Sequence, residues 1–114
     1  ERTFLFARRI NGYVSGLPKT LPNNENGRQL IRSGGSVGAN YIEANEALSK
    51  KDFFMRIKIC RKEAKESGFW LRLTEPHSTQ AQERDFLIQE ATELMKIFGA
   101  IISRNNRKQS LNKD

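Results

Sequence analysis

The sequence has a single cysteine, Cys60, and a single histidine, His77. One cysteine excludes a disulfide within the chain and is typical of proteins from a reducing cytoplasm. One cysteine and one histidine are also too few ligands for a zinc site of the usual kind within one chain. We therefore expect a cytoplasmic protein that needs no metal and no cofactor.

The sequence also lacks any apolar run of the roughly 18 to 20 residues that a bilayer-spanning helix needs, so we expect no membrane contact. Acidic residues are fewer than basic ones, with 13 Asp and Glu against 20 Lys and Arg, a net charge of +7. The excess is local, because residues 50–72 hold eight basic and three acidic side chains, and residues 103–114 hold four and one. Such local positive charge suggests contact with a polyanion, although charge also serves solubility alone.

Apolar residues recur at spacings of three and four along most of the chain, which is the period of an amphipathic helix, and no stretch alternates as a strand does. Four such rows are present. Their members are Phe6, Ile10, Tyr13 and Leu17; Leu30, Gly34, Val37, Tyr41, Ala44 and Leu48; Phe53, Ile57, Cys60, Ala64, Ser67 and Leu71; and Leu87, Ala91, Leu94, Phe98 and Ile101.

The segments between and after these rows carry turn signals. Residues 16–27 hold two prolines and two glycines and predict a connector. Ser49 precedes Asp52 at the spacing of a helix-capping pair. Residues 104–114 are polar and basic and predict a flexible tail after a single domain of residues 1–103. Four amphipathic helices with short connections predict an all-α, antiparallel up-and-down four-helix bundle.

The stretch RSGGSVGAN, residues 32–40, holds three glycines within the second row. It lacks the strand before it and the Lys-Ser or Lys-Thr after it that a phosphate-binding loop needs. The apolar row passes through it without a change of phase, so the stretch predicts a helix made thin for close packing. Gly34 and Gly38 would admit another helix or subunit.

A row of polar residues lies beside these glycines: Ser33, Ser36, Asn40 and Glu43. Two interpretations stand equally. The row is either a solvated face of the helix, or a buried polar network that fixes how helices or subunits pack.

Residues 29–73, QLIRSGGSVGANYIEANEALSKKDFFMRIKICRKEAKESGFWLRL, carry three ordered blocks. The blocks comprise Gln29, Leu30, Arg32, Ser33, Ser36, Val37, Ala39, Asn40 and Glu43; Ser49 to Phe53; and Lys62 to Ala64, Glu66, Ser67, Trp70 and Leu71. In these blocks the chain resembles the four-helix-bundle proteins encoded in intervening sequences of bacterial 23S ribosomal RNA genes, the S23 family. It departs at Tyr41 and Ala44, where many members have isoleucine and glycine.

The resemblance implies a non-enzymatic bundle that assembles as a ring-like homopentamer. It also implies a presumed binding of structured RNA or other nucleic acid. Related bundles are accessory proteins of retroelement reverse transcriptases, so a protein-interaction adaptor is the alternative function. The residues expected at helix or subunit contacts are Arg32, Ser33, Gly34, Ser36, Gly38, Asn40, Glu43 and Trp70.

The third helix supplies the candidate residues for nucleic-acid binding: Lys50, Lys51, Arg56, Lys58, Arg61, Lys62 and Lys65. The last four of these share one helix face, since spacings of three and four align. Contacts from such a face would be to phosphate and would not read base sequence. The competing interpretation is a solvated face that Glu63 and Glu66 partly neutralise.

An enzyme is the least favoured class. Glu43, Glu63 and Glu66 could converge inside a bundle, but a di-iron site needs Glu-x-x-His pairs that the sequence does not contain. The serines have no histidine at hand for nucleophilic catalysis. Cys60 lies in an apolar row and is typical of a small core residue.

Overall fold

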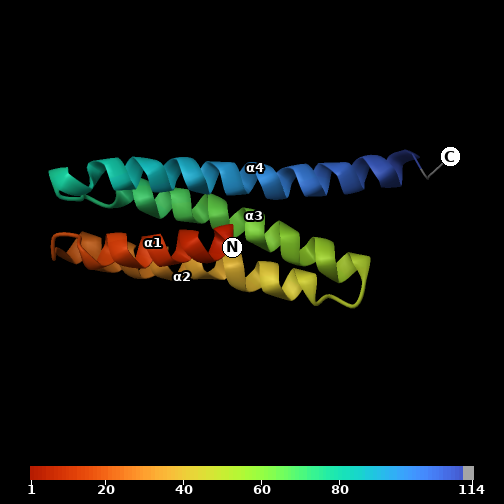
Figure 1. Ribbon diagram of the computed structural model, residues 1–114, viewed down its shortest axis with the longest axis horizontal. Helices are drawn as coiled ribbons and strands as arrows, with labels where there is room; N and C mark the ends of the chain where they lie inside the picture. The colour runs from red at the N-terminus through yellow and green to blue at the C-terminus, as the bar shows by residue number, and fades with distance from the viewer. Residues whose placement is uncertain (112–114) are drawn as a thin grey trace.

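The computed structural model describes residues 1–111, which fold into four helices joined by short turns (Figure 1). The helices are α1 (Arg2–Ser15), α2 (Leu21–Asn45), α3 (Lys50–Leu73) and α4 (Ala81–Leu111), and a 3-10 turn (Ser78–Gln80) precedes α4. No residue between 1 and 111 lies in a strand. The helices run antiparallel to their chain neighbours, which confirms the all-α bundle. None of these helices has the length and apolar content needed to cross a membrane.

The core consists of one row of side chains from each helix, as the sequence predicts. Its members are Phe6, Ile10, Tyr13, Leu17, Leu30, Val37, Ala44, Ile57, Cys60, Ala64, Leu71, Leu87, Ala91, Leu94, Phe98 and Ile102. Four expected apolar members fall outside it: Phe53 and Ile101 are partly buried against this core, whereas Tyr41 and Leu48 are exposed. Tyr41 is 36% exposed and packs its ring against Phe98, and Leu48 is 98% exposed. Leu48 lies beyond the end of α2 at Asn45, so the helical phase that would direct it inward no longer applies.

The second helix begins earlier than the sequence suggests. Thr20 caps it by accepting a hydrogen bond of 3.2 Å from the Asn23 amide, and Pro22 lies in the first turn, where no intrahelical N–H is needed. Residues 21–27, predicted as part of a connector, are therefore helical. The prediction was wrong because proline and a capping threonine mark a helix start as readily as a loop. The Ser49 cap is confirmed, since its hydroxyl accepts from the Asp52 amide at 3.1 Å.

The fourth helix continues to Leu111, eight residues beyond the predicted domain boundary at residue 103. Residues 104–111 therefore extend a helix where we expected a tail, because Arg104, Arg107, Lys108 and Gln109 are good helix formers even though they bury little. Residues 112–114, the end of that predicted tail, lie outside the described residues.

The glycines of α2 let α1 approach closely, as the thin-helix interpretation predicts. A Cβ atom on Gly34 would lie 2.5 Å from Cδ1 of Ile10, and one on Gly38 would lie 3.3 Å from Oγ1 of Thr3. Ordinary carbon contacts are about 3.5–4.0 Å, so a side chain at Gly34 would overlap α1. The helical cost of glycine is thus offset by burial between α1 and α2.

The first helix covers only one half of the bundle (Figure 1). Its 14 residues span about 21 Å at 1.5 Å per residue, whereas the longest axis of the molecule is 56 Å. Two arginines of α1, seven residues apart, form ion pairs with two glutamates of the antiparallel helix α4 that are also seven residues apart. Arg2 donates to Glu90 at 2.7 and 2.9 Å, and Arg9 donates to Glu83 at 2.6 and 3.0 Å.

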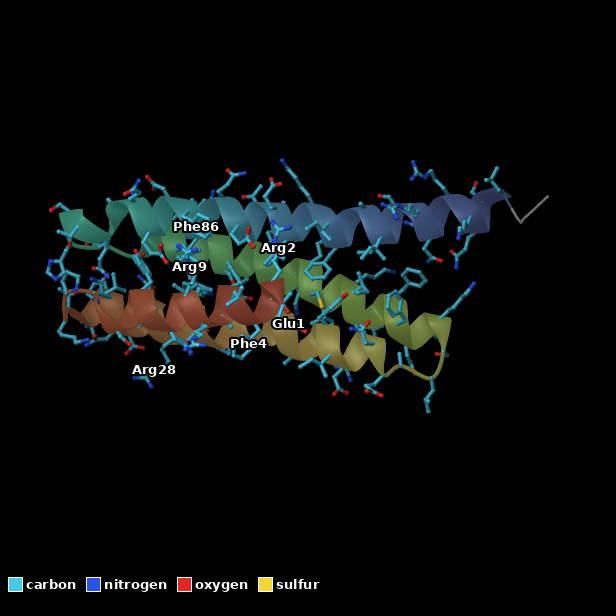
Figure 2. The ribbon with its side chains drawn as sticks, viewed as in Figure 1. Glu1, Arg2, Phe4, Arg9, Arg28 and Phe86 are labelled. Atoms are coloured by element: carbon cyan, nitrogen blue, oxygen red, sulfur yellow. The ribbon has the colours of Figure 1, made fainter. Side chains whose placement is uncertain are left out.

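The contact between α1 and α4 also includes an aromatic ring. The Arg9 guanidinium lies 3.9 Å from the ring centre of Phe86 (Figure 2), a cation–π contact. The hydrogen bonds from Arg2 hold the pKa of the Glu90 carboxyl below its ordinary value. The ion pair therefore stabilises the fold at pH values above the pKa that the Glu90 carboxyl has in the unfolded chain. This stabilisation is lost as the pH falls through the lower pKa of the folded state.

Candidate functional site

The outer face of α3 carries a stripe of exposed cations, which we call the α3 stripe: Lys58, Arg61, Lys62 and Lys65. Core residues Ile57, Cys60 and Ala64 point the other way, so the helix period turns the four cations toward solvent. None of the four has a carboxylate within ion-pair distance among the described residues. Their charge is therefore available to a ligand.

The two acidic residues that could have neutralised this face contact α2 instead. Arg32 on α2 forms an ion pair with Glu63 at 3.5 Å and a second pair with Glu66. Glu66 also accepts a hydrogen bond of 2.9 Å from the Trp70 indole nitrogen. Glu63 is only 6% exposed. These carboxylates thus join α3 to α2. Arg32 neutralises one of their two negative charges, so one negative charge remains beside the four positive charges of the α3 stripe.

Arg56 differs from the other predicted nucleic-acid-binding residues. It is half-buried, and its Nη1 donates a 3.0 Å hydrogen bond to the Asn40 side-chain oxygen. Asn40 in turn donates to the Ser36 carbonyl at 2.9 Å and to its hydroxyl at 3.0 Å. The structure therefore places Arg56 in a polar link between α2 and α3. Lys50 and Lys51 are exposed at the start of α3.

The polar row of α2 divides between the two interpretations. Ser33 is fully buried, and its hydroxyl lies 2.9 Å from that of Ser67 on α3, which donates to the Glu63 carbonyl. Ser36 and Asn40 form a second, separate link to α3 through Arg56. Glu43 is exposed and lines a hollow with Asp52 and Arg56, whereas Glu63 and Glu66 contact Arg32. The three glutamates therefore do not converge, and residues 1–111 contain no group of three His, Cys, Asp or Glu suited to a metal ion.

The Cys60 thiol is part of the core. Burial raises its pKa to about 11, and its sulfur lies 3.4 Å from the Val37 carbonyl oxygen, to which it donates. A thiol with so high a pKa carries almost no thiolate at neutral pH and is a poor nucleophile.

Replacing Arg32 by alanine is expected to lower the free energy of unfolding by about 1–2 kcal/mol, measured by urea denaturation. Stranding a buried carboxylate costs about 3–5 kcal/mol, and the figure is reduced here because the Arg32 side chain is 50% exposed. Adding Glu63→Gln should restore part of the loss, because a neutral amide needs no cation. An Arg32→Ala midpoint equal to that of the original chain would contradict this role.

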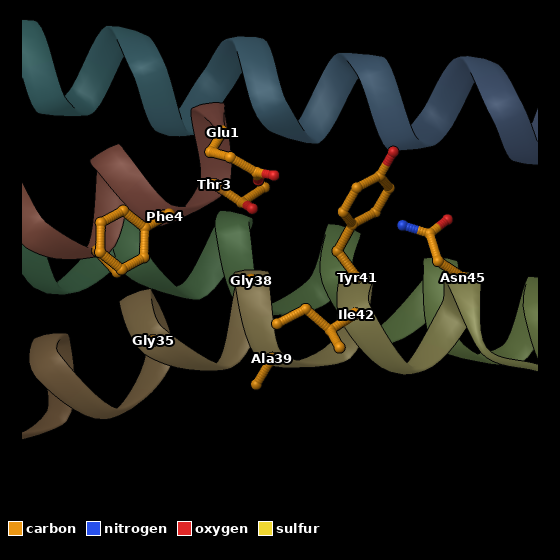
Figure 3. Close-up of a pocket in the computed structure, with 10 residues that line it drawn as sticks. Glu1, Thr3, Phe4, Gly35, Gly38, Ala39, Tyr41, Ile42 and Asn45 are labelled. Atoms are coloured by element: carbon orange, nitrogen blue, oxygen red, sulfur yellow. The ribbon is translucent and has the colours of Figure 1, made fainter.

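A shallow apolar groove lies on the outer side of α1 and α2, which we call the α1–α2 groove (Figure 3). It has a volume of about 430 Å³, and Phe4 and Ile42 flank a floor of Gly35, Gly38 and Ala39. Phe4 is 59% exposed and Ile42 is 63% exposed. A Cβ on Gly35 would meet nothing within 4 Å, so Gly35 faces solvent while Gly34 faces α1. The spacing of the glycines in the sequence does not distinguish these two roles.

A cleft that was not predicted from the sequence lies between the start of α3 and the end of α4. It is lined by Phe54, Met55, Asn105, Asn106, Gln109 and neighbouring lysines. The spacing of Lys51, Phe54 and Lys58 does place an aromatic ring between two cations on one helix face. No sequence signal could add the α4 amides, because residues 104–111 were expected to be a tail.

Comparison with known proteins shows the family of this chain. The model of the family described as 23S rRNA-intervening sequence protein matches residues 1–100. The chain belongs to this family. A crystal structure of a protein of unknown function from the S23 ribosomal protein family of Bacteroides thetaiotaomicron VPI-5482 is 30% identical to it, with a TM-score of 0.72. That likeness covers 89% of this chain and 94% of the other. No curated protein matches the sequence.

Membership of the 23S rRNA-intervening sequence protein family confirms the resemblance that the sequence blocks carry. The structure gives those blocks a physical meaning. Arg32, Ser33 and Asn40 from the first block join Glu63, Glu66, Ser67 and Arg56 of the following helix. Six of the residues that carry the family resemblance therefore fix α2 against α3.

Proposed function

We propose that this protein is a non-enzymatic, homo-oligomeric member of its family that binds structured nucleic acid through the α3 stripe. The observation that carries the proposal is the combination of four exposed, unpaired cations with acidic neighbours already engaged by Arg32. Without those ion pairs, Glu63 and Glu66 would be free to offset part of the positive charge.

The geometry of the α3 stripe suits a phosphate backbone. From Lys58 to Lys65 the helix rises about 10 Å, which is about three times the axial rise per phosphate of one B-DNA strand. Lysine and arginine contacts to phosphate release counterions and hold the ligand without reading its bases. We therefore expect binding that depends on charge and backbone shape more than on sequence.

A salt titration tests this proposal on the unmodified protein. If each protomer contacts about four phosphates, the logarithm of affinity should fall with the logarithm of salt concentration with a slope of about −3. Raising salt from about 50 to about 200 mM would then weaken binding roughly a hundredfold. Fluorescence anisotropy with labelled RNA and DNA measures it. An affinity that does not change with salt, or no binding at low salt, would reject the α3 stripe as a phosphate-binding face.

The homo-oligomer, proposed as a ring-like pentamer, is supported by the α1–α2 groove. Exposed apolar surface around a concave floor of small residues is the kind of surface that protein–protein interfaces cover. Gly35 and Ala39 would let a neighbouring subunit approach the α2 backbone. Assembly in a ring would repeat the α3 stripe around the particle and raise the local positive potential.

Light scattering should therefore give about 65 kDa, five times the chain mass of 13.1 kDa. Ile42→Glu should lower that mass, because it places a charge in the apolar groove. Leu21→Glu is the matched control, since Leu21 is 73% exposed but lies outside the groove. A measured mass of about 13.1 kDa, that of one chain, would contradict the proposed oligomer.

The same apolar groove supports the alternative function, a protein-interaction adaptor such as an accessory subunit of a reverse transcriptase. The two functions differ in what occupies the groove and in whether nucleic acid binds. An oligomer that does not bind nucleic acid but binds a polymerase, with Ile42→Glu abolishing that contact, would favour the adaptor.

A further inference from the structure

The end of the bundle where α3 begins and α4 finishes contains a cleft of about 530 Å³ (Figure 1 shows both helix ends on the same side of the molecule). We call it the α3–α4 cleft. Volumes of about 300–1,000 Å³ are typical of sites that enclose small molecules. The cleft lies next to the α3 stripe, because Lys58 belongs to both.

The charge of the α3–α4 cleft favours an anion. Lys50, Lys51 and Lys58 line it, and none of them has an ion-pair partner among residues 1–111. Asp52 is the one carboxylate among the lining residues. The N-terminus of α3 adds the partial positive charge of its free N–H groups.

The cleft also offers an aromatic surface. Phe54 lines it and is half-buried, and Met55 beside it is 47% exposed. The ring of Phe53, which packs against the core, meets the ring of Phe54 edge-on with centroids 5.0 Å apart. Phe54 is thus held in place by the fold while it lines the cleft, as a stacking surface for a flat ring must be.

The α4 side of the cleft is formed by amides. Asn105, Asn106 and Gln109 line it, and none of their side chains makes a hydrogen bond within the described part of the chain. An amide both donates and accepts, which matches the edges of nucleobases. An acidic peptide would use the lysines but has no flat ring for Phe54.

We propose that the α3–α4 cleft receives an unpaired nucleotide, with its phosphate on the lysines, its base against Phe54 and its base edge toward the α4 amides. This inference rests on the proposed function and adds that the bound nucleic acid presents a single-stranded segment at this end of the bundle. A base within a duplex is stacked and paired, so it cannot enter such a cleft.

The test compares single-stranded and duplex RNA of equal charge by fluorescence anisotropy, using a U-rich strand of about 12 nucleotides and a duplex that carries the same number of phosphates. The variant Asn105→Ala/Asn106→Ala/Gln109→Ala should weaken single-strand binding about tenfold and duplex binding less than about twofold. Gln82→Ala, an exposed amide at the other end of α4, should change neither. Phe54→Leu should resemble the triple variant, because it keeps apolar volume and removes the ring.

The outcomes separate this inference from the proposed function. If the triple amide variant and Phe54→Leu weaken the binding of single-stranded and duplex RNA equally, or weaken neither, the nucleotide site in the cleft is rejected. The proposal for the α3 stripe would then still stand. Competition by polyglutamate as strong as that by the RNA strand also overturns it and assigns the cleft to acidic peptides. Arg61→Glu/Lys62→Glu/Lys65→Glu lies outside the cleft and should weaken both ligands. If the unmodified protein binds neither, the proposed function itself fails.

Discussion

Replacing Gly34 by leucine is expected to lower the free energy of unfolding by about 2–3 kcal/mol. The first added carbon would already lie 2.5 Å from Cδ1 of Ile10, and three further carbons must find space between α1 and α2. Overpacking of this kind costs about 1–3 kcal/mol and sometimes more. The better helix propensity of leucine returns less than about 1 kcal/mol. Urea denaturation at fixed protein concentration measures the difference.

Gly12 provides the matched control for this prediction. A Cβ on Gly12 would meet nothing within 4 Å, so Gly12→Ala should stabilise the chain by about 0.5–1 kcal/mol through helix propensity alone. Gly34→Ala should lie between the two, because the end of the Ile10 side chain can turn away from one methyl group. If Gly34→Leu and the original chain unfolded at the same urea concentration, α1 would not pack as closely as described.

Reversing the charge of the α3 stripe should reduce nucleic-acid affinity more than roughly a hundredfold at about 0.1 M salt. The variant changes Lys58, Arg61, Lys62 and Lys65 to glutamate, which removes about four phosphate contacts and adds repulsion. The slope of the salt dependence should fall by about three to four. All four side chains are exposed, so the fold should survive, and circular dichroism checks this.

An equal change of charge elsewhere separates position from net charge. Reversing Arg8, Lys19, Arg28 and Lys96, which are exposed on α1, the following turn, α2 and α4, also takes the net charge from +7 by eight units to −1. This control should lose several-fold less affinity than the α3 stripe variant. Equal losses would show that binding follows net charge and would contradict a site on α3.

The sequence predicted those parts of the fold that depend on local periodicity. Phe6, Ile10 and Tyr13, or Ile57, Cys60 and Ala64, are buried because spacings of three and four put them on one helix face. Local capping was equally visible at Ser49. The start of α2 was not, since Pro22 is compatible with both a first helical turn and a loop.

The site was predictable as a set of cations but not as a surface. Spacing alone aligned Lys58 with Lys62 and Lys65 and left Arg56 off their face. The hydrogen bond that Arg56 donates to Asn40, sixteen residues away on another helix, was not predictable in this way. The engagement of Glu63 likewise depends on Arg32, thirty-one residues away. Side-chain partners across helices depend on how the helices pack, which one-dimensional periodicity does not specify.

The short length of α1 has a consequence for how the bundle opens. Four helices close the half that contains Gly34, and three close the half where α3 begins. Backbone amides exchange with solvent through local openings whose cost follows the buried contacts that must break. Backbone amides around Leu87 should therefore exchange slowly with solvent. Amides after Ile102, the last buried residue of α4, should exchange fast. A nucleotide held between α3 and α4 would add at that end the cross-helix contacts that α1 supplies at the other.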